Sequence, residues 1–285
     1  METSRIAQRL SRRFVAGETL ADALTVGRRI RSEGISLTLD HLGENVTSLA
    51  EAEASRDAYL RALTELRGAG LEPNVSVKLT QFGMDLSEDA CRANVAQVVR
   101  KAAELGGFVR VDMESSAYTD RTLRLVHELH AESAAVGTVI QAYLYRSEAD
   151  VKDLCARRIR VRLCKGAYLE PHSVAFPHKG DVDRNYTHLM QILLTDGVYP
   201  AIATHDPRMI DATREYATRH GFAHDRFEFQ MLYGIRRDLQ RELVAHGYRL
   251  RLYVPFGKAW YPYFMRRLAE RPANLFFLLR NLLRK

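Results

Sequence analysis

The feature that most constrains this chain is a regular alternation of two kinds of segment. Eight short runs are rich in β-branched or apolar residues, and an amphipathic stretch follows each of them. The runs cover residues 35–39, 74–80, 108–113, 138–143, 158–164, 200–204, 226–230 and 249–254. Eight strands that alternate with helices over 285 residues predict a single α/β domain, a (β/α)₈ barrel of the TIM type.

The segments between the runs have the pattern of helices. In 88–105 the apolar residues fall on one face of a 3.6-residue period, and Ser87 is a favourable N-cap. Ser147 followed by Asp150 predicts a capping box at the start of another helix. Glycines are expected to end helices before the next strand at Gly106, Gly137, Gly221 and Gly247.

The alternative α/β architecture is a doubly wound sheet. Such a sheet usually carries G-x-G-x-x-G after its first strand, and the sequence contains neither that motif nor a Walker A loop. We therefore expect three parts: an N-terminal helical arm over 1–34, the barrel over 35–274, and a C-terminal helix over 275–285 that lies over the barrel mouth.

Composition narrows the setting and the partners. The formal net charge is +7, and nine Lys or Arg but a single acid, Glu270, lie from Arg249 onward. A basic surface of this kind suits anionic ligands, a membrane surface or nucleic acid. The cysteines have no CxxC spacing, the N-terminus has no apolar signal core, and no apolar run could span a membrane. We expect a cytoplasmic location.

Polar residues follow most of the predicted strands, where a barrel places its chemistry. Arg162 and Lys165 end the fifth strand, and Gly166 permits close approach of a ligand to the backbone. These cations could stabilise the negative charge of a reduced flavin, bind phosphate, or form ion pairs across the barrel mouth. The other strand-end residues are Lys78, Asp112, Met113, Gln141, Tyr168, Thr204, His205, Leu232 and Tyr253.

Two further patterns bear on ligands. Tyr263, Arg266 and Arg267 share one helix face near the C-terminus, where adjacent arginines suit bidentate capture of a carboxylate but are also typical of a solvated face. Histidines lack the spacing of metal ligands, because His41 stands alone after the first strand and His205 has no partners at ligand spacing. We expect no metal site.

The strand-end segments, taken in order, resemble those of the proline dehydrogenase family. The resemblance runs from about Leu37 to Asn274. The matching stretches are VSVKLTQFG (75–83), VDMESS (111–116), QAYLYR (141–146), VRLCKGAYLEP (161–171), DVDRNY (181–186), ATHDP (203–207), FEFQMLYG (227–234) and RLYVPFGKAWYPYFMRRLAERPAN (251–274).

The resemblance implies a noncovalent FAD at the barrel mouth, with L-proline stacked on its face. Arg162 would lie near flavin N5 and, with Asp112, would be catalytic. The implied cofactor-binding residues are Met113, Gln141, Arg162, Cys164, Lys165, Gly166, Thr204 and His205. The implied substrate-binding residues are Lys78, Arg266, Arg267, Tyr253, Tyr263, Tyr168, Leu232 and the entrance acid Glu44.

The implied reaction is hydride transfer from proline to FAD. Hydride loss needs a lone pair on the ring nitrogen, and clustered cations would favour the neutral amine. The product would be Δ1-pyrroline-5-carboxylate, and a membrane quinone would accept the electrons. The expected downstream partner is a separate pyrroline-5-carboxylate dehydrogenase, and no nucleic acid is expected. Cys164 departs from the more usual valine at its position.

Rival functions remain at this stage. Another flavin barrel, such as a methylenetetrahydrofolate reductase-like or amine-oxidising enzyme, is the nearest, although the paired arginines favour a small amino-acid carboxylate. A basic nucleic-acid or membrane module is the non-enzymatic rival, but the basic surplus coincides with the cofactor and substrate motif. The terminal LFFLLRNLLRK is amphipathic and basic, which fits either a peripheral contact with the inner face of the membrane or a helix packed on the barrel.

Overall fold

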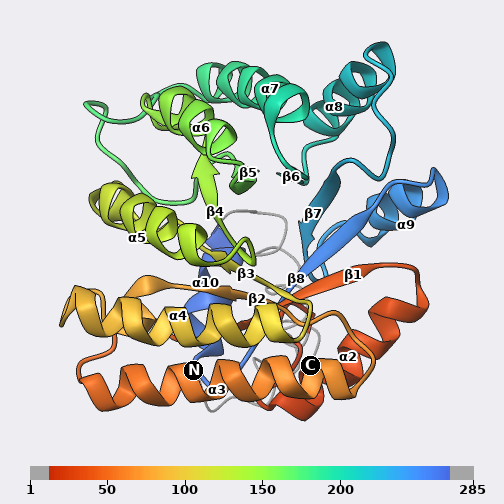
Figure 1. Cartoon of the computed structure of the whole chain (residues 1–285). Helices are drawn as coiled ribbons and strands as arrows, with labels where there is room; N and C mark the ends of the chain where they lie inside the picture. The colour runs from red at the N-terminus through yellow and green to blue at the C-terminus, as the bar shows by residue number, and fades with distance from the viewer. Residues whose placement is uncertain (1–12, 270–285) are drawn as a thin grey trace, which may run out of the picture.

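The computed structural model describes residues 13–269, except the side chains of Phe264 and of 266–269 in the last helix. Eight parallel strands close into a barrel in chain order, as the alternation predicted (Figure 1). The strands are β1 Ser36–His41, β2 Asn74–Val77, β3 Phe108–Val111, β4 Val136–Gln141, β5 Arg160–Cys164, β6 Ala201–Ala203, β7 Glu228–Leu232 and β8 Leu250–Phe256. The sheet closes where β1 pairs with β8, with Ser36 opposite Arg251 and His41 opposite Phe256.

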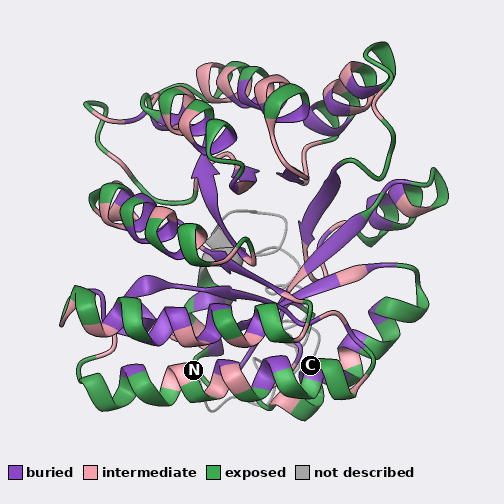
Figure 2. Cartoon of the chain, in the orientation of Figure 1, coloured by how far each residue is buried: buried purple, intermediate pink, exposed green. Residues whose placement is uncertain are grey.

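Helices surround the barrel. They are α2 Leu20–Ser32, α3 Leu49–Gly68, α4 Glu88–Glu104, α5 Thr119–Glu132, α6 Ser147–Ala156, α7 Lys179–Asp196, α8 Pro207–Arg219, α9 Arg237–Ala245 and α10 Trp260–Ala269, with short 3₁₀ turns η1 Leu79–Phe82 and η2 Ser116–Tyr118. In Figure 2 the strands are buried, and each outer helix buries one side and exposes the other. This is the one-sided apolar pattern from which the helices were predicted.

The first and last described helices depart from the regular alternation of strand and helix. Helix α2 precedes β1 and packs against both β1 and β8, closing the side of the barrel where the first and last strands meet. Helix α10, which follows β8, brings the buried side chain of Tyr263 to the carboxyl ends of the strands. Helix α2 lies within the predicted N-terminal arm over 1–34, of which residues 1–12 are outside the described part of the chain. The predicted C-terminal helix over 275–285 lies outside the described residues.

One predicted cap was correct, whereas a predicted capping box and a predicted glycine helix stop were wrong. Ser87 caps α4 by accepting a hydrogen bond from the Ala90 amide, as expected. Ser147 does not form a capping box, because its hydroxyl donates to the Leu144 carbonyl and Asp150 pairs with Arg146 instead. Gly137 ends no helix: it lies inside β4, where a Cβ atom would come within 2.3 Å of the Arg160 carbonyl oxygen of the neighbouring strand.

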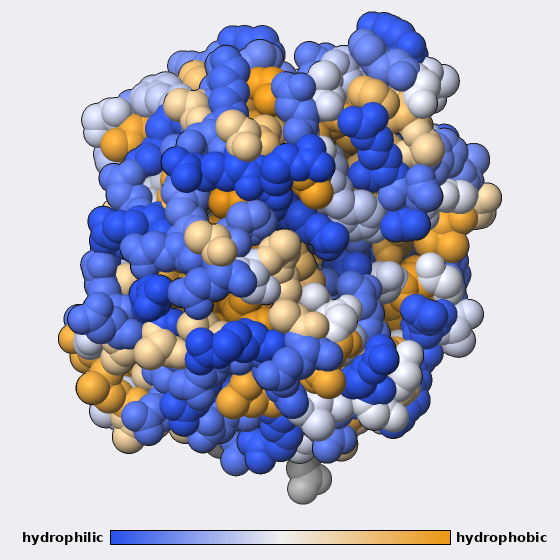
Figure 3. All heavy atoms as spheres, in the orientation of Figure 1, coloured by the Kyte–Doolittle hydropathy of each residue, from blue (hydrophilic) through white to orange (hydrophobic). Residues whose placement is uncertain are grey.

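No helix within residues 13–269 is long and apolar enough to cross a membrane. The face of the molecule in Figure 3 is mostly hydrophilic, and its apolar side chains occur in small separate groups.

Candidate functional site

A cavity of about 380 Å³ opens at the carboxyl ends of the strands, within the usual size range of small-molecule sites. It collects side chains from all eight strands or the loops that follow them, and Tyr263 from α10. Fifteen of the seventeen predicted site residues line it: Glu44, Lys78, Asp112, Met113, Gln141, Arg162, Cys164, Lys165, Gly166, Tyr168, Thr204, His205, Leu232, Tyr253 and Tyr263. The other two, Arg266 and Arg267, belong to α10, but their side chains lie outside the described part of the chain.

The floor of the cavity is a buried network of charges, which we call the floor cluster: Asp40, Lys78, Asp112, Arg162 and Tyr253. Asp112 stands at its centre, 2.8 Å from Arg162 Nη1 and accepting a hydrogen bond from the Tyr253 hydroxyl at 2.9 Å. Lys78 Nζ lies 3.1 Å from Asp40 Oδ1 and 3.9 Å from Asp112 Oδ2. Arg162 also lies over the Tyr253 ring, 5.4 Å from its centroid. Each charge of the floor cluster therefore has an opposite charge beside it.

Burial and charge act against one another on Lys78. Burial alone would lower its pKa, but the Asp40 and Asp112 carboxylates outweigh that effect, so the pKa lies above the ordinary lysine value. Lys78 is consequently a fixed ammonium, suited to holding an anion and unsuited to acting as a base. Tyr253 keeps its proton for a related reason, since burial raises its pKa well above the usual value.

The rim of the cavity carries a second, more exposed network, the rim cluster: Lys165, Lys179, Asp183, Asp206 and Arg208. Lys165 bonds to Asp183 from α7 and lies 2.8 Å from Asp206, the N-cap of α8. Arg208 contacts the same two acids at 3.0 and 2.9 Å. Hydrogen bonds from Arg208 and Lys165 outweigh burial and hold the pKa of Asp206 below the usual range. The rim cluster thereby joins the ends of β5 and β6 to the first turns of α7 and α8.

Gly166 and Cys164 set the shape of the cavity between these clusters. Gly166 has φ +124°, and a Cβ atom there would lie 2.5 Å from the Tyr143 ring, so glycine is required. Burial raises the pKa of the Cys164 thiol to about 12, which keeps it protonated and makes it a packing group rather than a nucleophile.

The donors and acceptors of the cavity fit a polar ring system such as a flavin. Gln141 is buried, and its Oε1 has no hydrogen-bond partner among the described residues although it belongs to the cavity wall. A buried acceptor of this kind calls for an N–H donor, which the edge of an isoalloxazine ring offers. Lys165 at the rim and Arg162 at the floor supply cations for an anionic cofactor.

Sequence reasoning missed several members of these networks. Asp40 is fully buried in β1 and is the nearest counter-ion of Lys78. Its signal was an acid inside an otherwise apolar strand, which needs a partner to be buried. Asp183 lay within a motif that was recognised but received no role. No group of three His, Cys, Asp or Glu in the described part of the chain could hold a metal ion.

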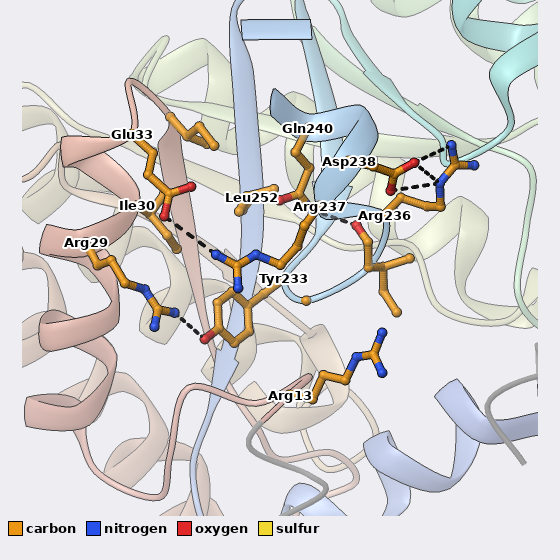
Figure 4. A pocket seen from close by; sticks show the side chains of 13 residues that line it. Arg13, Arg29, Ile30, Glu33, Tyr233, Arg236, Arg237, Asp238, Gln240 and Leu252 are labelled. Carbon is orange, nitrogen blue, oxygen red and sulfur yellow. Dashed lines mark hydrogen bonds and ion pairs between the residues drawn. The ribbon is translucent and has the colours of Figure 1, made fainter. Parts of the chain in front are cut away.

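A second hollow, of about 700 Å³, lies between α2 and the turn after β7 (Figure 4). Arginines line it, but they are engaged with protein groups. Arg29 donates to the Tyr233 hydroxyl at 2.7 Å, Arg237 lies 3.7 Å from Glu33, and Arg236 binds both carboxylate oxygens of Asp238. The contact between Arg237 and Glu33 holds α9 against the end of α2. We therefore interpret the hollow as a place where elements pack together and not as a catalytic site.

Comparison with known proteins agrees with this geometry. The family model described as proline dehydrogenase matches residues 23–280. The proline dehydrogenase of Deinococcus radiodurans is 44% identical over 280 residues, covering 96% of this chain and 90% of the relative. Proline dehydrogenase 2 of Bacillus subtilis is 41% identical over 273 residues, with the same coverage.

A solved structure has the same fold. It is proline utilization A (PutA) from Bdellovibrio bacteriovorus, inactivated by N-propargylglycine, with a TM-score of 0.86 and 30% identity. The match covers 92% of this chain and 32% of that larger one.

Proposed function

This chain belongs to the proline dehydrogenase family, whose reaction is the oxidation of proline, and from that premise we propose that FAD accepts the hydride and that Δ1-pyrroline-5-carboxylate is the product. The observation that carries the proposal is the convergence of fifteen predicted site residues on one cavity. A membrane quinone is the proposed acceptor of the electrons. A separate pyrroline-5-carboxylate dehydrogenase is the proposed consumer of the product.

The cofactor is assigned to the side of the cavity formed by β4, β5 and β6. Bound there, FAD would supply the hydride acceptor. Its proposed contacts are Met113, Gln141, Arg162, Cys164, Lys165, Gly166, Thr204 and His205. His205 is held for this purpose, because its Nε2 accepts a hydrogen bond from the Leu232 amide at 2.9 Å. That bond leaves the proton on Nδ1 and fixes the direction in which the ring can donate.

The substrate is assigned to the opposite side. Lys78, with Arg266 and Arg267 from α10, would bind the proline carboxylate, and Glu44 would stand at the entrance. Tyr168, Leu232, Tyr253 and Tyr263 would enclose the ring and exclude water. Hydride transfer needs the proline carbon held against its acceptor in near-attack geometry, so orientation is the main task of these residues.

Asp112 and Arg162 have catalytic roles in this proposal. Asp112 fixes Arg162 Nη1 and the Tyr253 hydroxyl, so one carboxylate orients both the cation beside the cofactor and the ring that covers the substrate. The reacting proline nitrogen must be neutral. Lys78 and Arg162 are balanced by Asp40 and Asp112. The proposed addition of Arg266 and Arg267 gives the site a surplus of cations, which favours loss of the proton, since like charges raise the cost of the protonated amine.

A visible absorption spectrum of the purified protein, before and after anaerobic addition of L-proline, tests the proposal. We expect a flavin band that bleaches with L-proline. A flavin band that does not bleach with L-proline would mean that the substrate is another amine or a folate. Absence of flavin, even after reconstitution with FAD, would refute the proposed cofactor.

A further inference from the structure

A line of buried polar side chains runs from the cavity into the barrel interior. Arg162 Nε donates to Gln230 Oε1 at 2.5 Å, and Gln230 Nε2 donates to Glu228 Oε1 at 2.5 Å. Glu228 in turn accepts from Arg251 Nε at 2.9 and 3.1 Å. Arg251 finally reaches Glu72 at 2.9 Å, on the far side of the barrel from the cavity.

These residues come from the strands that flank the cofactor side of the cavity. Glu228 and Gln230 are two residues apart on β7, so their side chains share the face that points into the barrel. There they meet Arg162 from β5 and Arg251 from β8. All four are buried. Gln230 lines the cavity, whereas Glu228 and Arg251 are not part of its wall. Any influence of Glu228 on a ligand must therefore pass through Gln230 or act through space.

The line has a direction because its members differ in hydrogen-bonding capacity. An amide accepts at one end and donates at the other, while a carboxylate only accepts. Burial opposes ionisation of Glu228, but the charge and hydrogen bonds of Arg251, with the hydrogen bond from Gln230, outweigh it and hold its pKa below the ordinary value. Glu228 is consequently an obligate acceptor, and it turns the Nε2 end of Gln230 toward itself.

The consequence reaches Arg162. With Nε2 committed to Glu228, Gln230 presents Oε1 to Arg162 Nε. A flipped amide would set N–H groups of Gln230 against the N–H of Arg162, and the two donors would repel. Asp112 holds Nη1 at the other side of the guanidinium. Two acceptors thus fix the plane of the group that lies nearest the proposed flavin.

We propose that Glu228 and Arg251 are positioning residues for Arg162, acting through the amide of Gln230. The proposal rests on the proposed function, since Arg162 is taken to contact FAD. Glu228→Met should break the line, because Gln230 Nε2 loses its acceptor and the amide is no longer held with its oxygen toward Arg162. Glutamine would be a poor choice at this position, because one oxygen, Oε1, accepts from both Gln230 Nε2 and Arg251 Nε and an amide oxygen could do the same.

The test measures the affinity of apo-protein for FAD by quenching of flavin fluorescence, for wild type, Glu228→Met, Gln230→Met and the double variant. Each single variant should bind FAD about tenfold more weakly, the order expected for loss of one hydrogen bond to a charged group. The double variant should bind no more weakly than Gln230→Met, because Glu228 acts only through Gln230. Glu72→Gln is the matched control: it removes the other acid from Arg251 and should leave FAD affinity within about twofold.

Three outcomes would overturn the proposal. Additive losses in the double variant would mean that Glu228 acts through space. Unchanged FAD affinity in Glu228→Met, with reduced thermal stability, would mean a purely structural ion pair. If Glu228→Met does not fold, Gln230→Met keeps the buried Glu228–Arg251 pair, and unchanged FAD affinity in that variant would be decisive against the proposal. A wild-type protein that takes up no FAD would instead refute the proposed function itself.

Discussion

The floor and the rim of the same cavity are both built from ion pairs, but they differ in burial. In the floor cluster the Lys78 side chain is 10% exposed and its partner Asp40 is 0% exposed. In the rim cluster Lys179 is 68% exposed and Arg208 is 66% exposed. A charge without a partner is costly at the floor, where water cannot replace the lost contact, and cheap at the rim.

The difference indicates what each cluster does. The floor cluster holds cations and acids in fixed positions, as the orientation of a small substrate demands. The rim cluster shares two acids among three cations, so any one contact can be exchanged for another or for water. A rim of this kind can accommodate the polar parts of a large cofactor as it enters.

The largest effect is expected from removing a floor acid. Asp40→Asn leaves the Lys78 ammonium buried, with Asp112 at 3.9 Å as its remaining ion-pair partner within 4 Å among the described residues. Breaking a buried pair costs about 3–5 kcal/mol, and chemical denaturation should show a loss of that size. Asp57→Asn, in a surface pair with Arg56, is the matched control and should not change the denaturation midpoint. A loss no greater than that of the control would mean that the floor is as solvated as the rim.

The ion pair of Lys78 with Asp40 also makes the stability of the folded protein fall at alkaline pH. Because the pKa of Lys78 is raised in the folded protein, its contribution is present below the unfolded lysine value, about 10.4, and is lost as pH rises above it. The wild-type protein should therefore lose stability above that pH, and Asp40→Asn should lose less of it over the same range. Denaturation at a series of alkaline pH values would show whether the two curves converge.

The next largest effect is expected from a substitution at Gly166, which lies between the floor cluster and the rim cluster. Gly166→Ala puts a methyl group 2.5 Å from the Tyr143 ring and forces alanine to φ +124°. Strain of this kind costs about 1–3 kcal/mol and should weaken FAD binding, because the loop after β5 must move. Gly180→Ala in α7 meets only a distant Arg184 atom, at 3.8 Å, and should be neutral or stabilising. Equal behaviour of the two variants would remove any special role of Gly166.

The fold could be predicted from sequence because its signals are local. β-Branched runs separated by amphipathic helices specify the eight units, and each predicted strand overlaps the observed one. The failures arose where a competing contact decides, from a neighbouring strand at Gly137 and from the preceding turn at Ser147. Gly137 looked like a helix stop, but the approach of the Arg160 carbonyl requires glycine there. Ser147 looked like a cap, but Leu144 and Arg146 competed for its partners.

The site was predictable to a similar extent. Residues at strand ends must converge in a barrel, so the cavity wall could be anticipated from position alone. Their counter-ions could not, because they depend on register. Asp40 lies opposite Ser76 and thus close to Lys78, which follows the adjoining strand, a relation that exists only once β1 and β2 are aligned. The roles assigned to individual residues stay predictions until a ligand is bound.

A rim acid should have a small and salt-dependent effect. Asp206→Asn keeps an effective N-cap for α8 but removes the charge shared by Lys165 and Arg208. We expect a loss of about 0.5–1 kcal/mol at low salt that shrinks as salt is added. The pKa of Asp206 is lowered in the folded state, so this contribution is present above the unfolded value near 3.9 and disappears as pH falls below it. A loss of stability that salt does not reduce would mean that the charges of the rim cluster are as shielded from solvent as those of the floor cluster.

The smallest effect on stability is expected from a substitution in the hollow beside α2. This hollow lies outside the cavity and offers a third, solvent-exposed ion pair for the comparison. Arg237 lies 3.7 Å from Glu33, and its side chain is 54% exposed, so Arg237→Gln should cost less than about 0.5 kcal/mol. It should also leave FAD affinity unchanged, because this arginine braces α2 against α9 and takes no part in the cavity wall. Denaturation and flavin-fluorescence titration of the same preparation measure both quantities. A marked loss of FAD affinity would show that the contact between Arg237 and Glu33 controls the end of β7, where Leu232 lines the cavity and the next residue, Tyr233, lines the hollow.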